Sequence, residues 1–151
     1  MIILSKLADY GVIIATHLAV GPERLVNAAL VAQETRLPPA TVAKVLKALA
    51  HGGVVIGTRG AAGGYRLARE AERITVAEVV AAIDGDIGIT QCSVHAPACE
   101  RTQYCPTRPH WQRINAAVGE ALAAVTLADM AAPMFPLTPR PTPRKFESVR
   151  P

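Results

Sequence analysis

Residues 39–67, PATVAKVLKALAHGGVVIGTRGAAGGYRL, predict a helix that leads directly into a two-stranded hairpin. Proline is tolerated in the first turn of a helix and the glycine pair after His51 would stop it, so we expect the helix over residues 39–51. Aliphatic side chains at three- and four-residue steps form its buried stripe: Val42, Val45, Leu46 and Leu49. Small, polar and basic side chains occupy the opposite face: Thr41, Lys44, Ala48 and His51, with Lys47 at its edge.

The hairpin is expected from residues 54–58 and 65–67, which are typical of strands and flank a glycine-rich turn. Such a turn can cradle phosphate only where a helix follows at once and supplies its N–H groups, and here a strand follows. A hairpin directly after a helix with a basic face is instead typical of the wing of a winged-helix protein. Arg59 at its tip, backed by glycines, suits insertion into a narrow minor groove of DNA.

The N-terminal segment predicts two further helices. Ser5 can cap the first, whose apolar positions recur at helical steps and which Gly21-Pro22 would end. Asn27 can cap a second helix over residues 28–35, and a tight turn then leads to the helix over residues 39–51. Two short helices joined by a tight turn, the second with a small and basic outer face, favour a helix-turn-helix that enters the major groove. The alternative is an ordinary helical hairpin with solvated lysines.

Two helices are predicted beyond the hairpin. Thr75 and Glu78 form a capping-box pattern that starts a helix ending near Asp84. A longer helix should run from Pro109 to about Val125, and its apolar side chains lie on one narrow stripe: Trp111, Ile114, Val118, Leu122 and Val125. A long, narrow stripe favours a symmetric dimer, with packing onto the same chain as the alternative.

The stretch from Thr90 to His110 holds every cysteine of the chain, at Cys92, Cys99 and Cys105. Its prolines disfavour regular structure, so we expect a loop that holds three thiols near one another. A disulfide pair would leave one cysteine over. Polar and charged side chains interrupt the apolar N-terminus before it could form a signal peptide or a membrane span: Lys6, Asp9 and His17. We therefore expect a cytoplasmic chain whose thiols stay reduced.

Clustered thiols in a reducing compartment usually take part in metal or redox chemistry. Structural zinc sites usually contain closely spaced cysteine pairs, whereas the gaps here are six and five residues. Wide gaps suit an iron–sulfur cluster, in which thiolates bind at separate corners. The residues alone leave two alternatives open: a thiol redox switch, and three small side chains packed in a helical domain.

The charge distribution agrees with a nucleic-acid partner near the N-terminus. Residues 1–75 hold nine Lys/Arg and five Asp/Glu, whereas residues 76–130 hold three and six. No nucleophile–base pair or paired carboxylates occur in a recognisable setting, so an enzyme is not expected. The expected fold class is mainly α with a small β wing. The expected divisions are a winged helix-turn-helix DNA-binding domain (1–75), a connecting helix and cysteine loop (76–106), a dimerisation helix (107–130) and a disordered, proline-rich basic tail (131–151).

Four segments of the chain resemble the IscR/NsrR-type regulators (the Rrf-two family). They are LSKLADYGV at residues 4–12, TRGAAGGYRL at 58–67, ITVAEVVAAIDG at 74–85 and the C-x6-C-x5-C loop. The run HWQRINAAVGEALAAVTLADM at 110–130 is most similar to the subgroup that regulates the SUF iron–sulfur assembly system. The resemblance covers about residues 1–130, and the wing followed by the cysteine loop is a specific combination.

The resemblance implies a dimeric winged-helix transcription regulator that binds double-stranded DNA. It also implies that Cys92, Cys99 and Cys105 bind a [2Fe–2S] or [4Fe–4S] cluster whose presence alters DNA affinity. The long C-terminal helix would cross the two-fold axis and bring the cysteine loop near the first helix of the partner. Arg59 would enter the minor groove. The full set of expected DNA contacts comes from the first helix, the recognition helix and the wing: Ser5, Lys6, Thr41, Lys44, Lys47, His51 and Arg59.

Two features depart from the family pattern. Some relatives use a histidine three residues after the last cysteine, where this chain has Arg108, which cannot ligate iron. A nitric-oxide-sensing branch uses an acidic residue from the first helix of the partner, so Asp9 is the expected fourth ligand, ahead of His110 and His95. The alternative for Asp9 is an ordinary salt bridge. On the recognition helix the assembly-system regulator has an acidic residue and then an amide where this chain has Ala43-Lys44, so a different operator is expected.

The expected function is a DNA-binding regulator controlled by an iron–sulfur cluster, acting on SUF assembly genes or on iron- and redox-response genes. Two alternatives stay open. One is a regulator that senses oxidants by thiol chemistry without a metal. The other is a cluster-carrying assembly factor with no DNA target.

Overall fold

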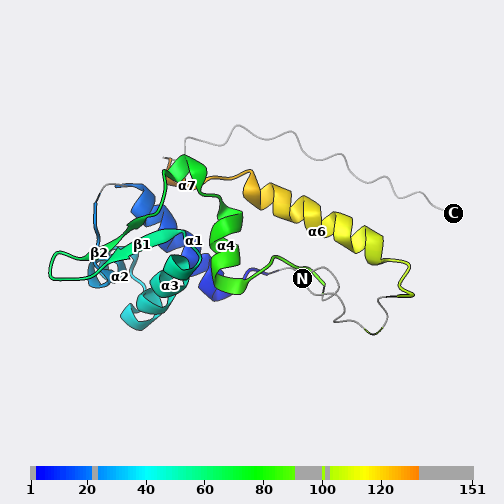
Figure 1. Ribbon diagram of the computed structural model, residues 1–151, viewed down its shortest axis with the longest axis horizontal. Coiled ribbons are helices and arrows are strands. Elements are labelled where there is room, and N and C mark those ends of the chain that lie inside the picture. Colours follow the sequence, from blue (N-terminus) through cyan, green and yellow to red (C-terminus); the bar gives the residue numbers. More distant parts are fainter. Residues whose placement is uncertain (1–2, 22–23, 91–99, 101–102, 133–151) are drawn as a thin grey trace.

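The computed structural model describes residues 3–21, 24–90, 100 and 103–132. Its elements confirm a mainly helical chain with a small antiparallel hairpin (Figure 1). Three helices come first: α1 (Lys6–Ala19), α2 (Ala28–Thr35) and α3 (Pro39–His51). The hairpin and a short 3-10 helix follow: β1 (Val55–Thr58), β2 (Gly64–Leu67) and η1 (Ala71–Arg73). The remaining helices are α4 (Val76–Asp84), α6 (Arg108–Ala123) and α7 (Leu127–Ala131).

Side-chain caps fix where the helices begin, as the sequence predicts. The Ser5 hydroxyl accepts a hydrogen bond from an N–H in the first turn of α1. The Asn27 side chain accepts from the Leu30 N–H at 2.8 Å and so caps α2. Both halves of the predicted capping box are present at α4, because Thr75 and Glu78 each accept from the other's N–H. These caps satisfy N–H groups that the start of a helix leaves without partners.

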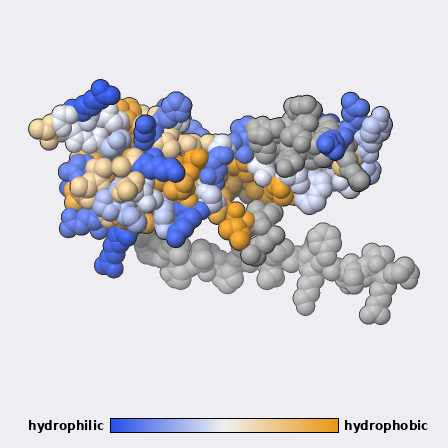
Figure 2. Space-filling view, turned by 90° about the horizontal axis from the view of Figure 1, so that it is seen from below, coloured by the Kyte–Doolittle hydropathy of each residue, from blue (hydrophilic) through white to orange (hydrophobic). Residues whose placement is uncertain are grey.

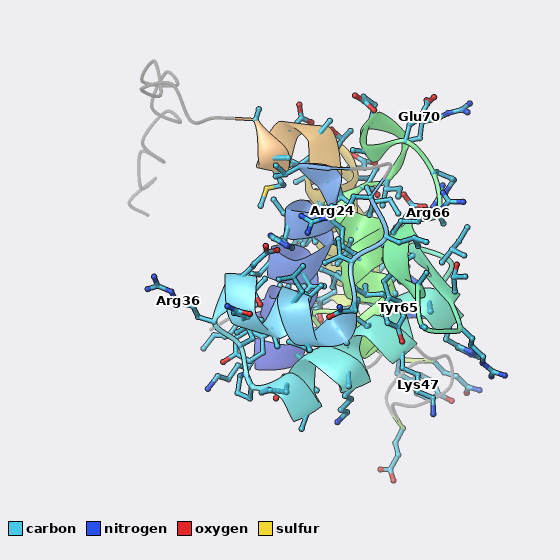
Figure 3. The ribbon with its side chains drawn as sticks, turned by 90° about the vertical axis from the view of Figure 1, so that its left-hand side faces the viewer. Arg24, Arg36, Lys47, Tyr65, Arg66 and Glu70 are labelled. Carbon is cyan, nitrogen blue, oxygen red and sulfur yellow. The ribbon has the colours of Figure 1, made fainter. Side chains whose placement is uncertain are left out.

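A single left-handed residue makes the turn between α2 and α3. Arg36 has a φ of 56° and its N–H donates to the carbonyl of Gln33 at 3.3 Å, which closes α2. The chain then turns and re-enters a helix at Pro39. The Arg36 side chain is exposed and points away from the hairpin (Figure 3). The tight turn between two packed helices confirms the predicted helix-turn-helix.

The hairpin is joined to the rest of the domain through β2. β1 and β2 pair in the register Val55↔Leu67 to Thr58↔Gly64. On its other edge β2 pairs with Val26, which exchanges two backbone hydrogen bonds of 3.0 and 2.8 Å with Tyr65. Gly64 permits this approach, since a Cβ there would lie 2.8 Å from the backbone of Val26. The stem of the wing is therefore held by the segment that leads into α2.

One hydrophobic core runs through the three-helix unit, the hairpin and the later helices. α1 lies against α4, α3 and α7, and its Ile14 is fully buried. Helix α3 contributes the stripe that the sequence predicts: Val42, Val45, Leu46 and Leu49, each at most 1% exposed. Ile74, Val79 and Leu127, which follow the hairpin in the sequence, belong to the same core. Among the described residues no charged or polar side chain is buried.

Helix α6 projects from this core (Figure 1). None of its residues is buried, and Trp111 and Ile114 are 38% and 45% exposed. Only the C-terminal part of the predicted stripe packs on the core, through partly buried Leu122 and Val125. Figure 2 shows apolar surface where the compact part of the molecule meets the projecting helix. The stripe is thus divided between contact with its own chain and exposure.

Across the described ranges, no helix has both the length and the apolar character needed to span a membrane.

Candidate nucleic-acid interface

The exposed face of α3 is basic. Lys44, Lys47 and His51 follow one another at three- and four-residue steps and are all exposed. Together with Ala82 of α4 they border a shallow hollow along the helix. Thr41, which the sequence places on the same face, is half-buried at its upstream end. The buried aliphatic stripe lies on the opposite face of α3 and packs into the core, so the basic side chains point outward.

The tip of the hairpin has a shape that only glycine allows. Arg59 is exposed in the turn between the strands. Gly60 has a φ of 115°, a region that side chains disfavour. A Cβ at Gly63 would lie 2.2 Å from the Thr58 carbonyl oxygen, so no side chain fits there. The shape of the turn that presents Arg59 therefore depends on glycine at positions 60 and 63.

A groove of about 500 Å³ joins the recognition helix to the wing. Lys47 of α3 and Arg59 of the turn lie on its walls, together with Asn27 and Tyr65. Figure 3 shows Tyr65 directly above Lys47 on the side of the molecule that carries the hairpin. The sequence alone did not predict a role for Tyr65 or Asn27 here. Tyr65 lies opposite Gly57 in the hairpin register, and a Cβ at Gly57 would lie 3.1 Å from its ring, so its position here depends on strand pairing.

Ser5 and Lys6, the two predicted DNA contacts at the start of α1, differ in how available their side chains are to DNA. The Ser5 hydroxyl caps α1 and also donates a 2.7 Å hydrogen bond to Asp84 Oδ1, so it holds α1 against the end of α4. Lys6 is exposed, and its Nζ lies 5.7 Å from the centre of the Tyr10 ring. Lys6 is the more available of the two for a phosphate.

Ion pairs within the described residues leave the basic face of α3 and the wing tip un-neutralised. His17 Nε2 lies 2.8 Å from Glu34 Oε2, between α1 and α2. Arg69 Nη2 lies 2.7 Å from Glu78 Oε1 at the start of α4. Burial raises the pKa of Glu78, but hydrogen bonds from Arg69 and Thr75 and the charge of Arg69 outweigh it, so this pKa lies below the ordinary glutamate value. Neither pair includes a residue of α3 or Arg59.

Of the predicted cluster ligands, the structure places Cys105, whereas Cys92, Cys99 and His95 lie outside the described residues. Cys105 is half-buried in the turn that begins α6, with its Sγ 3.3 Å from Thr107 Oγ1. The Arg108 N–H donates to the Cys105 carbonyl at 3.4 Å. Cys105 thus lies next to the start of α6, and its thiol is partly accessible to a ligand.

The candidates for a fourth ligand lie on two different helices. Asp9 is exposed on α1 and forms no ion pair with any described residue, so the salt-bridge alternative is not observed there. His110 is exposed in the first turn of α6. Arg108 is half-buried beside it, and its Nε is shielded from solvent without a hydrogen-bond partner in the described part of the chain. Within these same residues no three His, Cys, Asp or Glu side chains gather.

A helix-turn-helix with an outward basic face, followed by a hairpin with an arginine at its tip, defines a winged-helix DNA-binding protein. Comparison with known families then identifies the group. Residues 4–133 match the Rrf2 family, described as "Iron-dependent Transcriptional regulator", and the chain belongs to this family. It is a DNA-binding transcriptional regulator and not an enzyme.

Individual relatives agree with this membership. Protein rrf2 of Nitratidesulfovibrio vulgaris is 34% identical over 117 residues, which cover 78% of this chain and 76% of that protein. The HTH-type transcriptional regulator IscR of Xenorhabdus nematophila is 27% identical, over 78% of this chain and 69% of its own length.

Solved structures give the same result. IscR of T. potens superposes with a TM-score of 0.66 at 27% identity, covering 85% of both chains. CymR, the global cysteine regulator of B. subtilis, superposes with a TM-score of 0.68 at 30% identity, covering 87% of this chain and 97% of that one. The predicted membership of the IscR-like regulators is thereby confirmed.

Proposed function

We propose that this chain is a homodimeric regulator whose operator affinity depends on an iron–sulfur cluster held by Cys92, Cys99 and Cys105. The observation that carries the proposal is the position of Cys105 in the turn that begins α6, a long helix whose N-terminal half leaves Trp111 and Ile114 exposed. A thiolate at this place links the state of the cysteine loop to the helix that contacts a partner subunit. A bound cluster would supply a group that oxidation, nitric oxide or iron shortage can remove.

Exposed apolar side chains on two elements support the dimer. Trp111 and Ile114 are exposed on α6. A second surface beside α1 carries Ile13, Val20 and Met130, which are 39%, 74% and 44% exposed. Apolar area of this kind, on an otherwise well-packed domain, is typical of an interface. A second copy of the chain would cover it in a closed, two-fold arrangement.

Asp9 borders the second surface and is proposed as the fourth ligand, supplied by the partner subunit. Ile13 and Val20 follow Asp9 on the same side of α1, so a partner that covers them also meets its carboxylate. Three thiolates and one carboxylate would hold a cluster less tightly than four thiolates. That lability suits a sensor, which must lose its cofactor under the conditions it detects.

The DNA contacts are proposed for the first turn of α1, the outer face of α3 and the wing tip: Ser5, Lys6, Thr41, Lys44, Lys47, His51 and Arg59. Two α3 helices related by a two-fold axis read two half-sites, and their separation is set by how the subunits meet. Residues that fix α6 on the domain therefore control specific affinity without touching a base. The proposed targets are SUF assembly genes or iron- and redox-response genes, in a cytoplasm that keeps the thiols reduced.

A metal-free thiol sensor is the second candidate. The similarity to CymR, a global cysteine regulator, favours keeping it. It predicts a protein that is colourless when purified without air and that forms a disulfide after peroxide treatment. The assembly factor with no DNA target has lost its support, because the chain belongs to a family of transcriptional regulators.

The deciding experiment is purification under nitrogen, followed by iron and acid-labile sulfide analysis and a visible spectrum. The proposal expects iron and sulfide in the dimer, visible absorption, and loss of both in Cys105→Ser. Binding to an operator selected in vitro should then differ between cluster-loaded and cluster-free protein. A protein that carries no iron and takes none up, or equal affinity of the two forms, would contradict the proposal.

A further inference from the structure

We propose that Asn115 is a positioning residue: its side-chain amide sets the angle of α6 on the winged-helix domain, and through it the separation of the two α3 helices in the dimer. The inference rests on the dimer of the proposed function and adds a residue that neither the cysteine loop nor the DNA contacts include. It follows from how few contacts hold α6 to the domain.

Both polar groups of the Asn115 amide bind the segment that follows α4. Its Nδ2 donates to the Ile87 carbonyl at 2.9 Å. Its Oδ1 accepts from the Ile89 N–H at 3.0 Å. One side chain thus makes the pair of hydrogen bonds that a neighbouring β-strand would make to alternate residues of the segment. The partners lie 28 and 26 residues from Asn115 in the sequence, so this is a tertiary contact.

The segment that Asn115 grips is itself fixed to the domain. Asp84, the last residue of α4, accepts a 2.7 Å hydrogen bond from the Ser5 hydroxyl at the start of α1. Gly85 turns the chain with a φ of 82°. Ile87 then packs partly buried against the core. The amide of Asn115 therefore attaches α6 to a part of the domain that α1 and α4 hold in place.

A second set of backbone hydrogen bonds lies just beyond the C-terminal end of α6, where Leu122 also packs on the core. There the Val76 N–H donates to the Val125 carbonyl at 2.9 Å, and the Leu127 N–H donates to the Ile74 carbonyl at 2.8 Å. Asn115 is about 15 Å away along the helix, at 1.5 Å per residue. No residue of α6 itself is buried. Two attachment points hold the angle of the helix, whereas one point leaves a hinge.

A change in that angle alters how the two domains of a dimer lie on DNA. Two half-sites must be one helical turn apart, or a fixed multiple of it, for both recognition helices to enter the major groove. If α6 can tilt, the dimer accommodates wrong spacings at less cost and binds the right one less well. Asn115 would thus govern spacing preference although α6 lies apart from α3 (Figure 1).

The test compares wild type with Asn115→Ala and Asn115→Asp, all without cluster, on the duplex that the wild type selects from a random library. The aspartate keeps the shape and the acceptor for the Ile89 N–H but sets a carboxylate oxygen against the Ile87 carbonyl. Gln112→Ala is the matched control, since Gln112 is an exposed amide on the same helix. Each protein is measured on the selected duplex and on versions with one base pair added or removed between half-sites.

We expect the wild type and Gln112→Ala to lose about tenfold or more in affinity when the spacing changes by one base pair. Both Asn115 variants should lose less than about threefold, while their affinity for a single half-site stays unchanged. Equal spacing discrimination in all four proteins would overturn the inference and leave the dimeric regulator intact. A monomeric wild type in sedimentation would overturn the proposed dimer itself, and the inference with it.

Hydrogen exchange keeps the proposal testable if a variant folds poorly. In the wild type the Ile89 N–H should exchange slowly, because it donates a hydrogen bond to the side-chain oxygen Oδ1 of Asn115. If the Ile89 N–H exchanged as fast as an unprotected backbone amide, the hydrogen bond to Asn115 would be absent and the inference would be overturned.

Discussion

Gly52, at the end of α3, lies so close to Ala82 of α4 that a Cβ at position 52 would come within 2.4 Å of the Ala82 Cβ. The φ of Gly52 is −79°, so the backbone conformation suits any residue and only the space requires glycine. The C-terminal end of α3 thus packs closely on α4, which in turn contacts α1 and α6.

Gly52→Ala should therefore destabilise the fold by about 1–3 kcal/mol, the usual effect of overpacking, because Ala82 has no flexible atoms to move aside. Gly119→Ala is the matched control. Nothing lies within 4 Å of a Cβ at Gly119, and this substitution in α6 should stabilise. Urea unfolding followed by circular dichroism measures both. Similar shifts for the two variants would contradict the close packing of α3 on α4.

Gly63→Ala should impair DNA binding more than stability. Its Cβ would meet the Thr58 carbonyl at 2.2 Å, so the turn must change shape and Arg59 must change direction. We expect operator affinity to fall about tenfold, as for loss of the arginine contact itself. Ala62→Gly in the same turn is the control, and it should bind normally. Unchanged affinity of Gly63→Ala in a fluorescence anisotropy titration would show that the wing tip does not contact DNA.

Single substitutions of Lys44, Lys47 and Arg59 to alanine should identify the phosphate contacts by their salt dependence. Each lost contact should reduce the slope of log K against log salt by about one. Arg113→Ala on α6 removes an exposed charge far from the interface and should leave the slope unchanged. A uniform small change in all four variants would indicate general electrostatic attraction instead of defined contacts.

The capping box of α4 should give a measurable pH dependence. Because the pKa of Glu78 is lowered in the folded protein, the stabilisation that its carboxylate provides is complete at neutral pH. It is lost as the pH falls below the ordinary glutamate value and through the lowered folded value. Thermal unfolding between pH 7 and pH 3 should show a flatter profile for Glu78→Gln than for wild type. Parallel profiles would contradict the lowered pKa of Glu78.

Asp9→Ala should accelerate loss of iron from the reconstituted dimer without dissociating it, because the aliphatic side chains beside Asp9 remain. Glu120→Ala, an exposed acid on α6, is the control. The decay of visible absorption in the presence of a chelator measures the rate. A decay unchanged by Asp9→Ala would return the choice of fourth ligand to His110 and His95.

Local signals explain why so much of the fold could be predicted from the sequence. The bounds of α2 and α3 were predicted correctly from local signals. Asn27 caps the start of α2, Pro39 is tolerated in the first turn of α3, and Gly52 follows its last residue. The predicted capping box at Thr75 and the wing strands are confirmed for the same reason.

Contacts over long sequence separations could not be predicted in this way. Asn115 in a helix gives no sign that its amide binds backbone 26 residues earlier. The bridge between Val26 and Tyr65 likewise depends on tertiary packing. The long helix ends at Ala123, close to the predicted end near Val125, and the backbone at 125–127 then pairs with residues 74–76. The predicted DNA contacts and ligands remain predictions, with Cys92, Cys99 and His95 outside the described residues.

The double attachment of β2 has a practical consequence for engineering. Val26 pairs with one edge of this strand and β1 with the other, so backbone hydrogen bonds fix the hairpin stem on the domain and the turn extends beyond them. The five residues 59–63 can then be exchanged as a cassette for loops of equal length and similar glycine pattern, without shifting the strands that aim them. A library confined to that cassette would alter groove recognition while the scaffold behind it stays constant.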